Sequence, residues 1–174
     1  ITILFTTPEL LSSFVKGLES PKFGSLRTVI VGGDPMTREL ASEFREKFGL
    51  YPFEAYGCAE CSPGVSVNIF DFRASGLHQV GNRTGSVGRG LPGLALKIGE
   101  TSTLEDAGFD NPGILMVKGP NVMQGYVGPP EETEKVMKDG WFITEDLAKM
   151  DEDGFVTFLS KEQNTSSTSD RPVN

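Results

Sequence analysis

The first third of the chain alternates between two spacings of apolar residues. Apolar runs at residues 1–6 and 26–31, and an aromatic-rich stretch at 51–56, predict three strands, of which the first is expected to be buried. Between these strands, apolar residues recur at helical spacing over residues 7–18 and 37–48. The order strand–helix–strand–helix–strand predicts parallel pairing with right-handed crossovers.

Residues at the ends of both predicted helices support this assignment. Thr7 offers a side-chain oxygen that can cap the first helix. Pro8 suits the first helical position because its missing N–H would have no partner there. The second helix is expected to begin at Thr37 and to stop at Gly49.

The pattern changes in the second half of the chain. Residues 65–82 show no clear period and are interpreted as a connection. After Thr84, turn signals separate short apolar segments, which predicts a small antiparallel sheet or distorted barrel. One helix, beginning at Pro130, interrupts it, and residues 147–159 are expected to form a final hairpin. The expected apolar segments are 86–87, 94–98, 114–118, 141–144, 147–150 and 155–159.

We therefore predict an α/β fold with two subdomains. A parallel α/β subdomain is expected over residues 1–83, followed by a β-barrel-like subdomain over residues 84–161. Residues 162–174 are polar and rich in Ser and Thr, so we expect a disordered tail. The first residue is not Met and stands inside an apolar run, so we expect the chain to be part of a longer protein.

Composition narrows the functional classes. The chain has 174 residues, 37% of them hydrophobic, which is enough for a packed core. Its net charge is −8 and its pI about 4.7, whereas nucleic-acid binders usually present a basic face. We therefore expect no nucleic-acid partner. ATP is not excluded, because backbone N–H groups can build a phosphate site inside an acidic protein.

Two cysteines form a C-x-x-C pair at Cys58 and Cys61. The pair is either a redox couple, half of a zinc site or, as we favour, two small core or loop residues. His78, the single histidine, is interpreted as a surface residue rather than a catalytic one. No apolar run approaches the roughly 20 residues needed to span a bilayer, and no signal peptide is visible. We expect a cytoplasmic protein without a transmembrane segment.

A ligand site is expected where two predicted strands end. The turn at residues 32–34, Gly-Gly-Asp, and the segment at residues 56–58, Tyr-Gly-Cys, both follow strands of the parallel sheet. Ligands in such sheets gather at the carboxyl ends of the strands. Spacing alone leaves the simpler alternative open, in which these residues form ordinary turns.

Five motifs in order give the chain a family resemblance. The chain resembles the adenylate-forming superfamily, which comprises acyl-CoA synthetases, peptide adenylation domains and luciferases, over residues 1 to about 161. The run Tyr-Gly-Cys-Ala-Glu-Cys-Ser-Pro is most similar to that of bacterial acyl-acyl-carrier-protein synthetases, often fused to 2-acylglycerophosphoethanolamine acyltransferases. The motifs are Val-Gly-Gly-Asp-Pro at 31–35, Tyr-Gly-Cys-Ala-Glu at 56–60, Gly-Ser-Val-Gly-Arg at 85–89, Gly-Ile-Leu-Met-Val-Lys-Gly at 113–119 with Gly-Tyr at 125–126, and Trp-Phe-Ile-Thr-Glu-Asp-Leu at 141–147.

The resemblance implies roles for particular residues. The turn of Gly33, Asp34 and Pro35 would lie along one face of adenine and the ring of Tyr56 along the other, with Gly57 in the same loop. Glu54 and Ala55 would offer backbone groups to the edge of the base. Asp146 would accept hydrogen bonds from both ribose hydroxyls. Cys58 and Ala59 would border the carboxylate and the acyl chain, and Glu60 would bind the Mg²⁺ ion that bridges the ATP phosphates.

The implied reaction activates a carboxylic acid, most simply a fatty acid, with ATP and Mg²⁺. The acyl-adenylate would then pass its acyl group to the thiol of CoA or of acyl carrier protein. The parent protein would be a ligase, and the resemblance to fused acyltransferases is compatible with its association with a membrane.

The chain departs from the family pattern in ways that predict no turnover on its own. Ala59 replaces the usual Thr, and Glu145 stands where the family's Thr-Gly-Asp has Gly. The phosphate loop would precede residue 1, and the catalytic Lys has no counterpart. The usual Gly-Arg is replaced by Ser-Lys at 160–161. Two alternatives remain, namely a non-catalytic nucleotide-binding module or pseudoenzyme, and a nucleotide-binding α/β domain unrelated to ligases.

Overall fold

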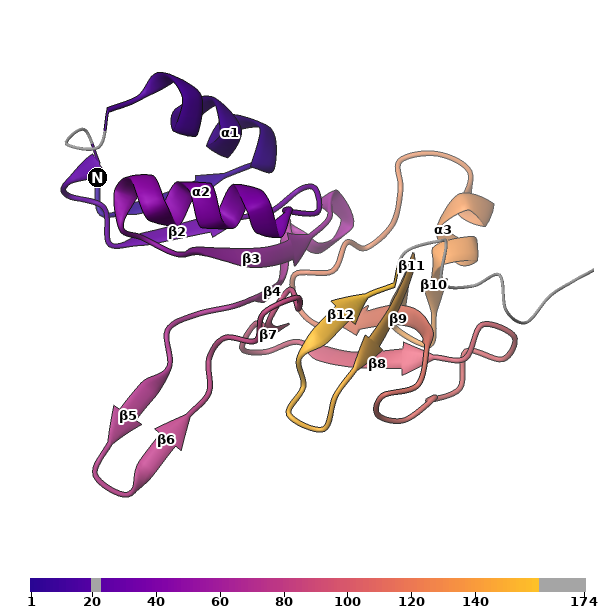
Figure 1. The fold of residues 1–174 in the computed structure, drawn as a ribbon. Helices are drawn as coiled ribbons and strands as arrows, with labels where there is room; N and C mark the ends of the chain where they lie inside the picture. The colour runs from indigo at the N-terminus through magenta and orange to yellow at the C-terminus, as the bar shows by residue number, and fades with distance from the viewer. Residues whose placement is uncertain (20–22, 160–174) are drawn as a thin grey trace, which may run out of the picture.

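A computed structural model describes residues 1–19 and 23–159 (Figure 1). The first five elements are β1 (Ile3–Thr6), α1 (Pro8–Gly17), β2 (Thr28–Val31), α2 (Arg38–Phe48) and β3 (Pro52–Gly57). β1, β2 and β3 pair in parallel in that order, as the sequence pattern predicts. Both helices pack over this sheet around a common core of Leu11, Leu26, Val29, Val31 and Phe44.

The predicted helix ends are confirmed. The Leu10 N–H donates to Thr7 Oγ1 over 3.4 Å at the start of α1. The Leu40 N–H donates to Thr37 Oγ1 over 3.2 Å at the start of α2. Gly49 ends α2 with φ +73°, a left-handed conformation that glycine adopts without a steric penalty. The second helix therefore stops so that β3 begins beside β2.

The expectation that the first strand is buried is wrong. Ile1, Ile3 and Phe5 are 90%, 53% and 74% exposed. β1 lies at one end of the sheet, and among the described strands it pairs with β2 alone. An apolar run predicts a strand, but its burial depends on whether a second layer covers it, which local sequence does not specify.

Residues 65–82 contain strands, so the predicted simple connection is also wrong. β4 (Gly64–Val67) pairs antiparallel to β3, and β7 (Arg89–Gly90) pairs with β4, giving the order β1-β2-β3-β4-β7. β5 (Phe72–Ala74) and β6 (Leu77–Gln79) form a two-stranded hairpin that projects from the sheet in Figure 1. His78 lies on it, exposed, with Nε2 3.3 Å from Asp71 Oδ2. Strands of two to four residues are too short to show a period.

The second half forms the predicted antiparallel sheet, curled into a half-barrel. Its strands are β8 (Ala95–Gly99), β9 (Gly113–Lys118), β10 (Met137–Lys138), β11 (Trp141–Met150) and β12 (Val156–Phe158). The order is β10-β11-β9-β8, and β12 pairs with β11 through the predicted final hairpin. α3 (Pro130–Val136) is the predicted helix. The expected segments 141–144 and 147–150 belong to one strand, and 86–87 lies outside the strands.

A second hydrophobic core joins the half-barrel to the end of the first sheet. Buried residues from β8, β9, β11 and β12 pack with Cys61 and Val65. The division into 1–83 and 84–161 stays a prediction. The expected disordered tail, 162–174, and the Ser-Lys pair at 160–161 lie outside the described residues. In the part of the chain that is described, no helix has the length and apolar character needed to cross a bilayer.

Candidate functional site

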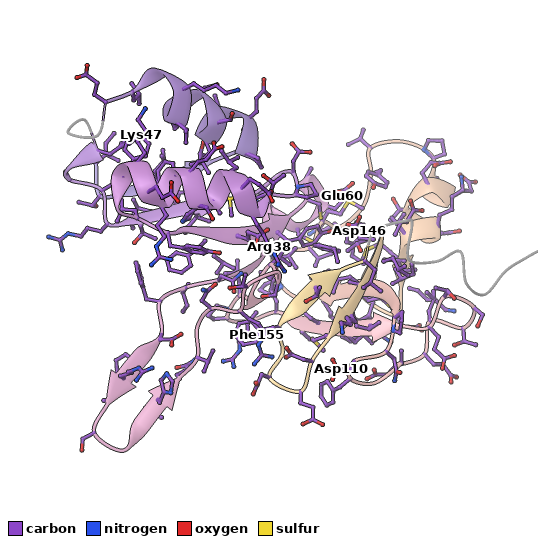
Figure 2. The ribbon with its side chains drawn as sticks, in the orientation of Figure 1. Arg38, Lys47, Glu60, Asp110, Asp146 and Phe155 are labelled. Atoms are coloured by element: carbon purple, nitrogen blue, oxygen red, sulfur yellow. The ribbon has the colours of Figure 1, made fainter. Side chains whose placement is uncertain are left out.

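Two residues far apart in the sequence meet where the two sheets approach each other. Tyr56, near the end of β3, donates a hydrogen bond from Oη to Asp146 Oδ2 over 2.5 Å. Asp146 comes from the middle of β11, and Figure 2 shows it beside Glu60. The predicted convergence of the Tyr-Gly loop with the distant aspartate is therefore present. The Tyr56 ring also packs against Phe158 of β12, with centroids 4.6 Å apart.

An irregularity in β11 places Asp146 at this site. The register of β11 against β9 shifts between Ile143 and Leu147. Glu145 lies within this shift and has φ +63°. Glycine usually occupies such a left-handed position in a β-bulge. Thr144 Oγ1 donates to the Leu115 carbonyl oxygen over 2.9 Å and accepts from the Asp146 N–H over 3.1 Å. The bulge therefore leaves the Asp146 side chain exposed beside Tyr56.

A tight loop after β3 places Cys58 and Glu60. A Cβ at Gly57 would lie 1.9 Å from the Pro63 carbonyl oxygen, so only glycine fits there. The Cys58 N–H donates to the same carbonyl over 2.9 Å. A single 3₁₀ turn over Ala59–Cys61 follows, with Cys61 fully buried below it. The loop therefore returns directly into β4 and leaves Glu60 at its outer side.

These residues surround one cavity of about 150 Å³. Pockets that enclose a drug-sized ligand usually measure about 300–1,000 Å³. The cavity therefore has room for a ring or a sugar but not for a whole nucleotide. Its lining residues are Tyr56, Cys58, Glu60, Tyr126, Val136, Phe142, Ile143, Thr144, Glu145 and Asp146.

The other predicted nucleotide residues lie outside the cavity lining. They are Gly33, Asp34, Pro35, Glu54, Ala55, Gly57 and Ala59. The turn after β2 is exposed, with φ +97° at Gly33. A Cβ at Gly32 would come 3.1 Å from the Ala55 carbonyl oxygen, so this turn and β3 lie side by side at one sheet edge. The nucleotide-binding and substrate-binding roles of these residues stay predictions.

Sequence reasoning gave no role to Tyr126, although its Gly-Tyr pair was one of the quoted motifs. Tyr126 Oη donates to Glu60 Oε1 over 2.7 Å. This hydrogen bond lowers the pKa of Glu60 and raises the pKa of Tyr126 to about 12. Phe142 and Val136 were likewise not predicted as lining residues, because their place depends on how α3 and β11 pack.

Burial and neighbouring groups also change other protonation equilibria. Burial, followed by the hydrogen bond to Asp146, raises the pKa of Tyr56, so its hydroxyl stays a donor. Burial raises the pKa of Glu54, against the opposing effect of Arg38. A hydrogen bond from Cys61 lowers the pKa of Cys58 and raises that of Cys61. Both cysteines are free thiols.

The cavity that would receive a cation has three carboxylates in its lining, at Glu60, Glu145 and Asp146. Within residues 1–19 and 23–159, no three His, Cys, Asp or Glu side chains are grouped as metal ligands. The C-x-x-C pair therefore gains no third ligand there for zinc. Mg²⁺, in contrast, is commonly bound by one or two carboxylates together with substrate phosphates and water. Glu60, at the cavity wall, fits that mode of binding.

Comparison with known proteins identifies the family. The profile described as "AMP-binding enzyme" matches residues 1–127. The chain belongs to the AMP-binding enzyme family. Among curated relatives in this family, a long-chain-fatty-acid–CoA ligase of Yersinia pestis is 35% identical over 141 residues, covering 81% of this chain and 24% of its own length. A probable 4-coumarate–CoA ligase 2 of Dictyostelium discoideum is 37% identical over 169 residues, covering 93% of this chain and 29% of its own length.

Solved structures of this AMP-binding family share the fold. Apo MatB from Rhodopseudomonas palustris superposes with a TM-score of 0.79 at 31% identity, covering 92% of this chain and 31% of its own. O-succinylbenzoate coenzyme A synthetase from Bacillus subtilis, in complex with ATP and magnesium ion, gives 0.74 at 28% identity, covering 94% and 32%. The chain spans about a quarter of the length of the first curated relatives it matches.

Proposed function

We propose that this chain forms part of the adenosine pocket of an ATP-dependent acyl-activating ligase. One observation carries the proposal: Tyr56 and Asp146, 90 residues apart, share a hydrogen bond on the wall of one cavity. A tyrosine supplies a flat surface for a base, and a carboxylate accepts hydrogen bonds from two hydroxyls. The membership in the AMP-binding family supports assigning both groups to adenosine.

The remaining roles follow the same assignment. Gly33, Asp34 and Pro35 would border the second face of adenine, and the backbone of Glu54 and Ala55 its edge. Asp146 would bind the ribose, with Tyr56 Oη steadying the carboxylate. Glu60 would bind the Mg²⁺ ion that accompanies ATP, and that ion would neutralise charge on the phosphates. Gly57, Cys58 and Ala59 would shape the wall next to the substrate carboxylate.

The proposed reaction has two steps. A carboxylate oxygen bonds to the α-phosphorus of ATP while the bond to pyrophosphate breaks. A thiolate sulfur then bonds to the acyl carbon, and AMP leaves. Pocket residues contribute by positioning the reactants and by stabilising charge.

We propose a fatty or other carboxylic acid as the substrate and CoA as the acceptor. The names of the relatives support CoA, because they are CoA ligases for long-chain fatty acids and for 4-coumarate. An acyl-carrier-protein acceptor is the second candidate, favoured by the run Tyr-Gly-Cys-Ala-Glu-Cys-Ser-Pro at 56–63. Thioester formation by the full-length protein with each acceptor would decide between them.

We also propose that the chain by itself binds nucleotide without turnover. No Lys or Arg is among the residues that line the cavity in the described ranges. This cavity would therefore supply no cationic side chain for the charge that develops on the α-phosphate. Release of pyrophosphate by the 174-residue chain alone would refute this proposal.

The experiment that tests the pocket assignment is calorimetry with AMP on the full-length protein. Asp146→Ala is expected to weaken AMP binding about 100-fold or more, since two hydrogen bonds to a charged group, each about 1.5–3 kcal/mol, are lost. Asp110→Asn is the control, because it removes the same charge from an exposed loop distant from Asp146 in Figure 2, and Asn tolerates the φ of +59° at this position. Equal AMP affinity in the Asp146 and Asp110 variants would refute the assignment of Asp146 to the ribose hydroxyls.

A non-catalytic nucleotide-binding module is the second candidate function. Glu145 favours it, because a non-glycine residue with φ +63° stands in the bulge beside the proposed ribose site. Ala59 favours it too, since it has no hydroxyl to offer to a phosphate. AMP binding without pyrophosphate release, measured on the full-length protein with a panel of carboxylic acids, would support this candidate over the ligase.

A further inference from the structure

The segment that follows β9 supports the loop carrying Glu60 from outside. Asn121 Nδ2 donates to the carbonyl oxygens of Cys61 and Gly64, over 2.6 and 2.8 Å. The Met123 N–H donates to the Glu60 carbonyl oxygen over 2.7 Å. These three bonds fix the backbone at Glu60 and on its C-terminal side. They leave the carboxylate itself to be oriented by another group.

That group is Tyr126, whose own position is set by α3. The Tyr126 N–H donates to Thr133 Oγ1 over 2.9 Å. A Cβ at Gly125 would come 2.9 Å from the same Oγ1, so the chain passes close to the helix just before Tyr126. From this anchored backbone, Tyr126 Oη reaches Glu60 Oε1 over 2.7 Å. The bond therefore joins the half-barrel to the loop after β3.

The bond between Tyr126 and Glu60 has more effect on orientation than on stability. Tyr126 is 42% exposed, and water competes for hydrogen bonds at such a position. A hydroxyl that donates to one carboxylate oxygen nevertheless restricts rotation of the carboxylate group. It also favours the ionised form, in line with the lowered pKa of Glu60.

We propose that Tyr126 is a positioning residue that occupies one oxygen of the Glu60 carboxylate and leaves the other for Mg²⁺. Mg²⁺ requires near-octahedral geometry, so a carboxylate held in one orientation binds it better than a rotating one. This inference rests on the proposed function, because it requires Glu60 to bind the cation that accompanies ATP. The Tyr126 ring lines the cavity, but its hydroxyl, which Tyr126→Phe removes, is bonded to Glu60 and is not expected to touch nucleotide or metal.

The test separates metal from nucleotide binding in the full-length protein. The affinity for ATP is measured by calorimetry over a series of Mg²⁺ concentrations and in EDTA, and the affinity for AMP is measured in parallel. Tyr126→Phe is expected to reduce the Mg²⁺-dependent gain in ATP affinity about five- to tenfold. Binding of AMP, and of ATP in EDTA, should not change. Tyr51→Phe is the matched control, since Tyr51 precedes β3 and does not line the cavity.

Combining variants distinguishes the possible failures. In a Glu60→Gln protein, adding Tyr126→Phe should have no further effect on the Mg²⁺ dependence, because both changes act through one carboxylate. If the Mg²⁺-dependent gain falls with Glu60→Gln but not with Tyr126→Phe, the positioning role is overturned and the pocket assignment stands. If Glu60→Gln also leaves the gain unchanged, the role of Glu60 and this inference both fail. Equal weakening of AMP by Tyr126→Phe would indicate a structural role and would overturn the inference as well.

Discussion

Glu145 offers a direct measure of the conformational cost of placing Asp146 beside Tyr56. Its φ of +63° lies in the left-handed region, where a residue with a Cβ is less stable by about 1–2 kcal/mol. Glycine removes this penalty but gains freedom in the unfolded chain, which offsets about 0.4–1 kcal/mol. Glu145→Gly should therefore raise the free energy of unfolding by about 0.5–1 kcal/mol.

The assay compares the original protein with the Glu145→Gly variant by urea unfolding and, in separate samples, by thermal denaturation. For a chain of this size, about 1 kcal/mol corresponds to a rise of about 2–4 °C in Tm. Glu152→Gly is the control, because it makes the same chemical change in the turn between β11 and β12 at a residue without a positive φ. The control should lose stability, since it gains only unfolded-state freedom. The reasoning is refuted if Glu145→Gly lowers the urea midpoint as much as the control does.

Two further predictions concern the loop after β3. Gly57→Ala should destabilise the chain by more than 1 kcal/mol in urea unfolding, because the new Cβ would lie 1.9 Å from the Pro63 carbonyl oxygen and the loop must move. Gly17→Ala, where a Cβ has open space, should be neutral or stabilising, and equal losses in both variants would contradict the steric argument. Iodoacetamide should modify the Cys58 thiol before the buried Cys61 thiol. In a Cys61→Ala protein the pKa of Cys58 should rise, so the pH profile of its alkylation should shift to higher pH. A profile that stays in place or shifts downward would show that the Cys61 thiol does not stabilise the thiolate.

Local sequence was sufficient for the parallel part of the fold. Thr37 and Gly49 mark the ends of α2 through contacts within a few residues, and the strands on either side follow at once. Such signals are readable because they depend on near neighbours. The exposure of Phe5 was not readable, because it depends on which layers cover the sheet.

The ends of the parallel strands pointed to Tyr56, but its partner across the cavity was predictable only through the family motifs. Nothing in local spacing relates Tyr56 to Asp146, and only the family resemblance predicted that the two residues lie in one site. The contact between Tyr126 and Glu60 was missed, although both residues stood in quoted motifs. A motif names residues without saying which pairs touch, and this contact depends on how α3 directs the chain past the loop.

The bond between Tyr56 and Asp146 has a consequence for the order of events during synthesis on the ribosome. Its two ends are separated by 90 residues, which take about 5–18 s to add at typical translation rates. Through that interval β1–β3 can assemble with their helices, but Asp146 has not yet been made. The cavity lined by Tyr56 and Asp146 can therefore form only after the half-barrel has emerged and packed against the first sheet.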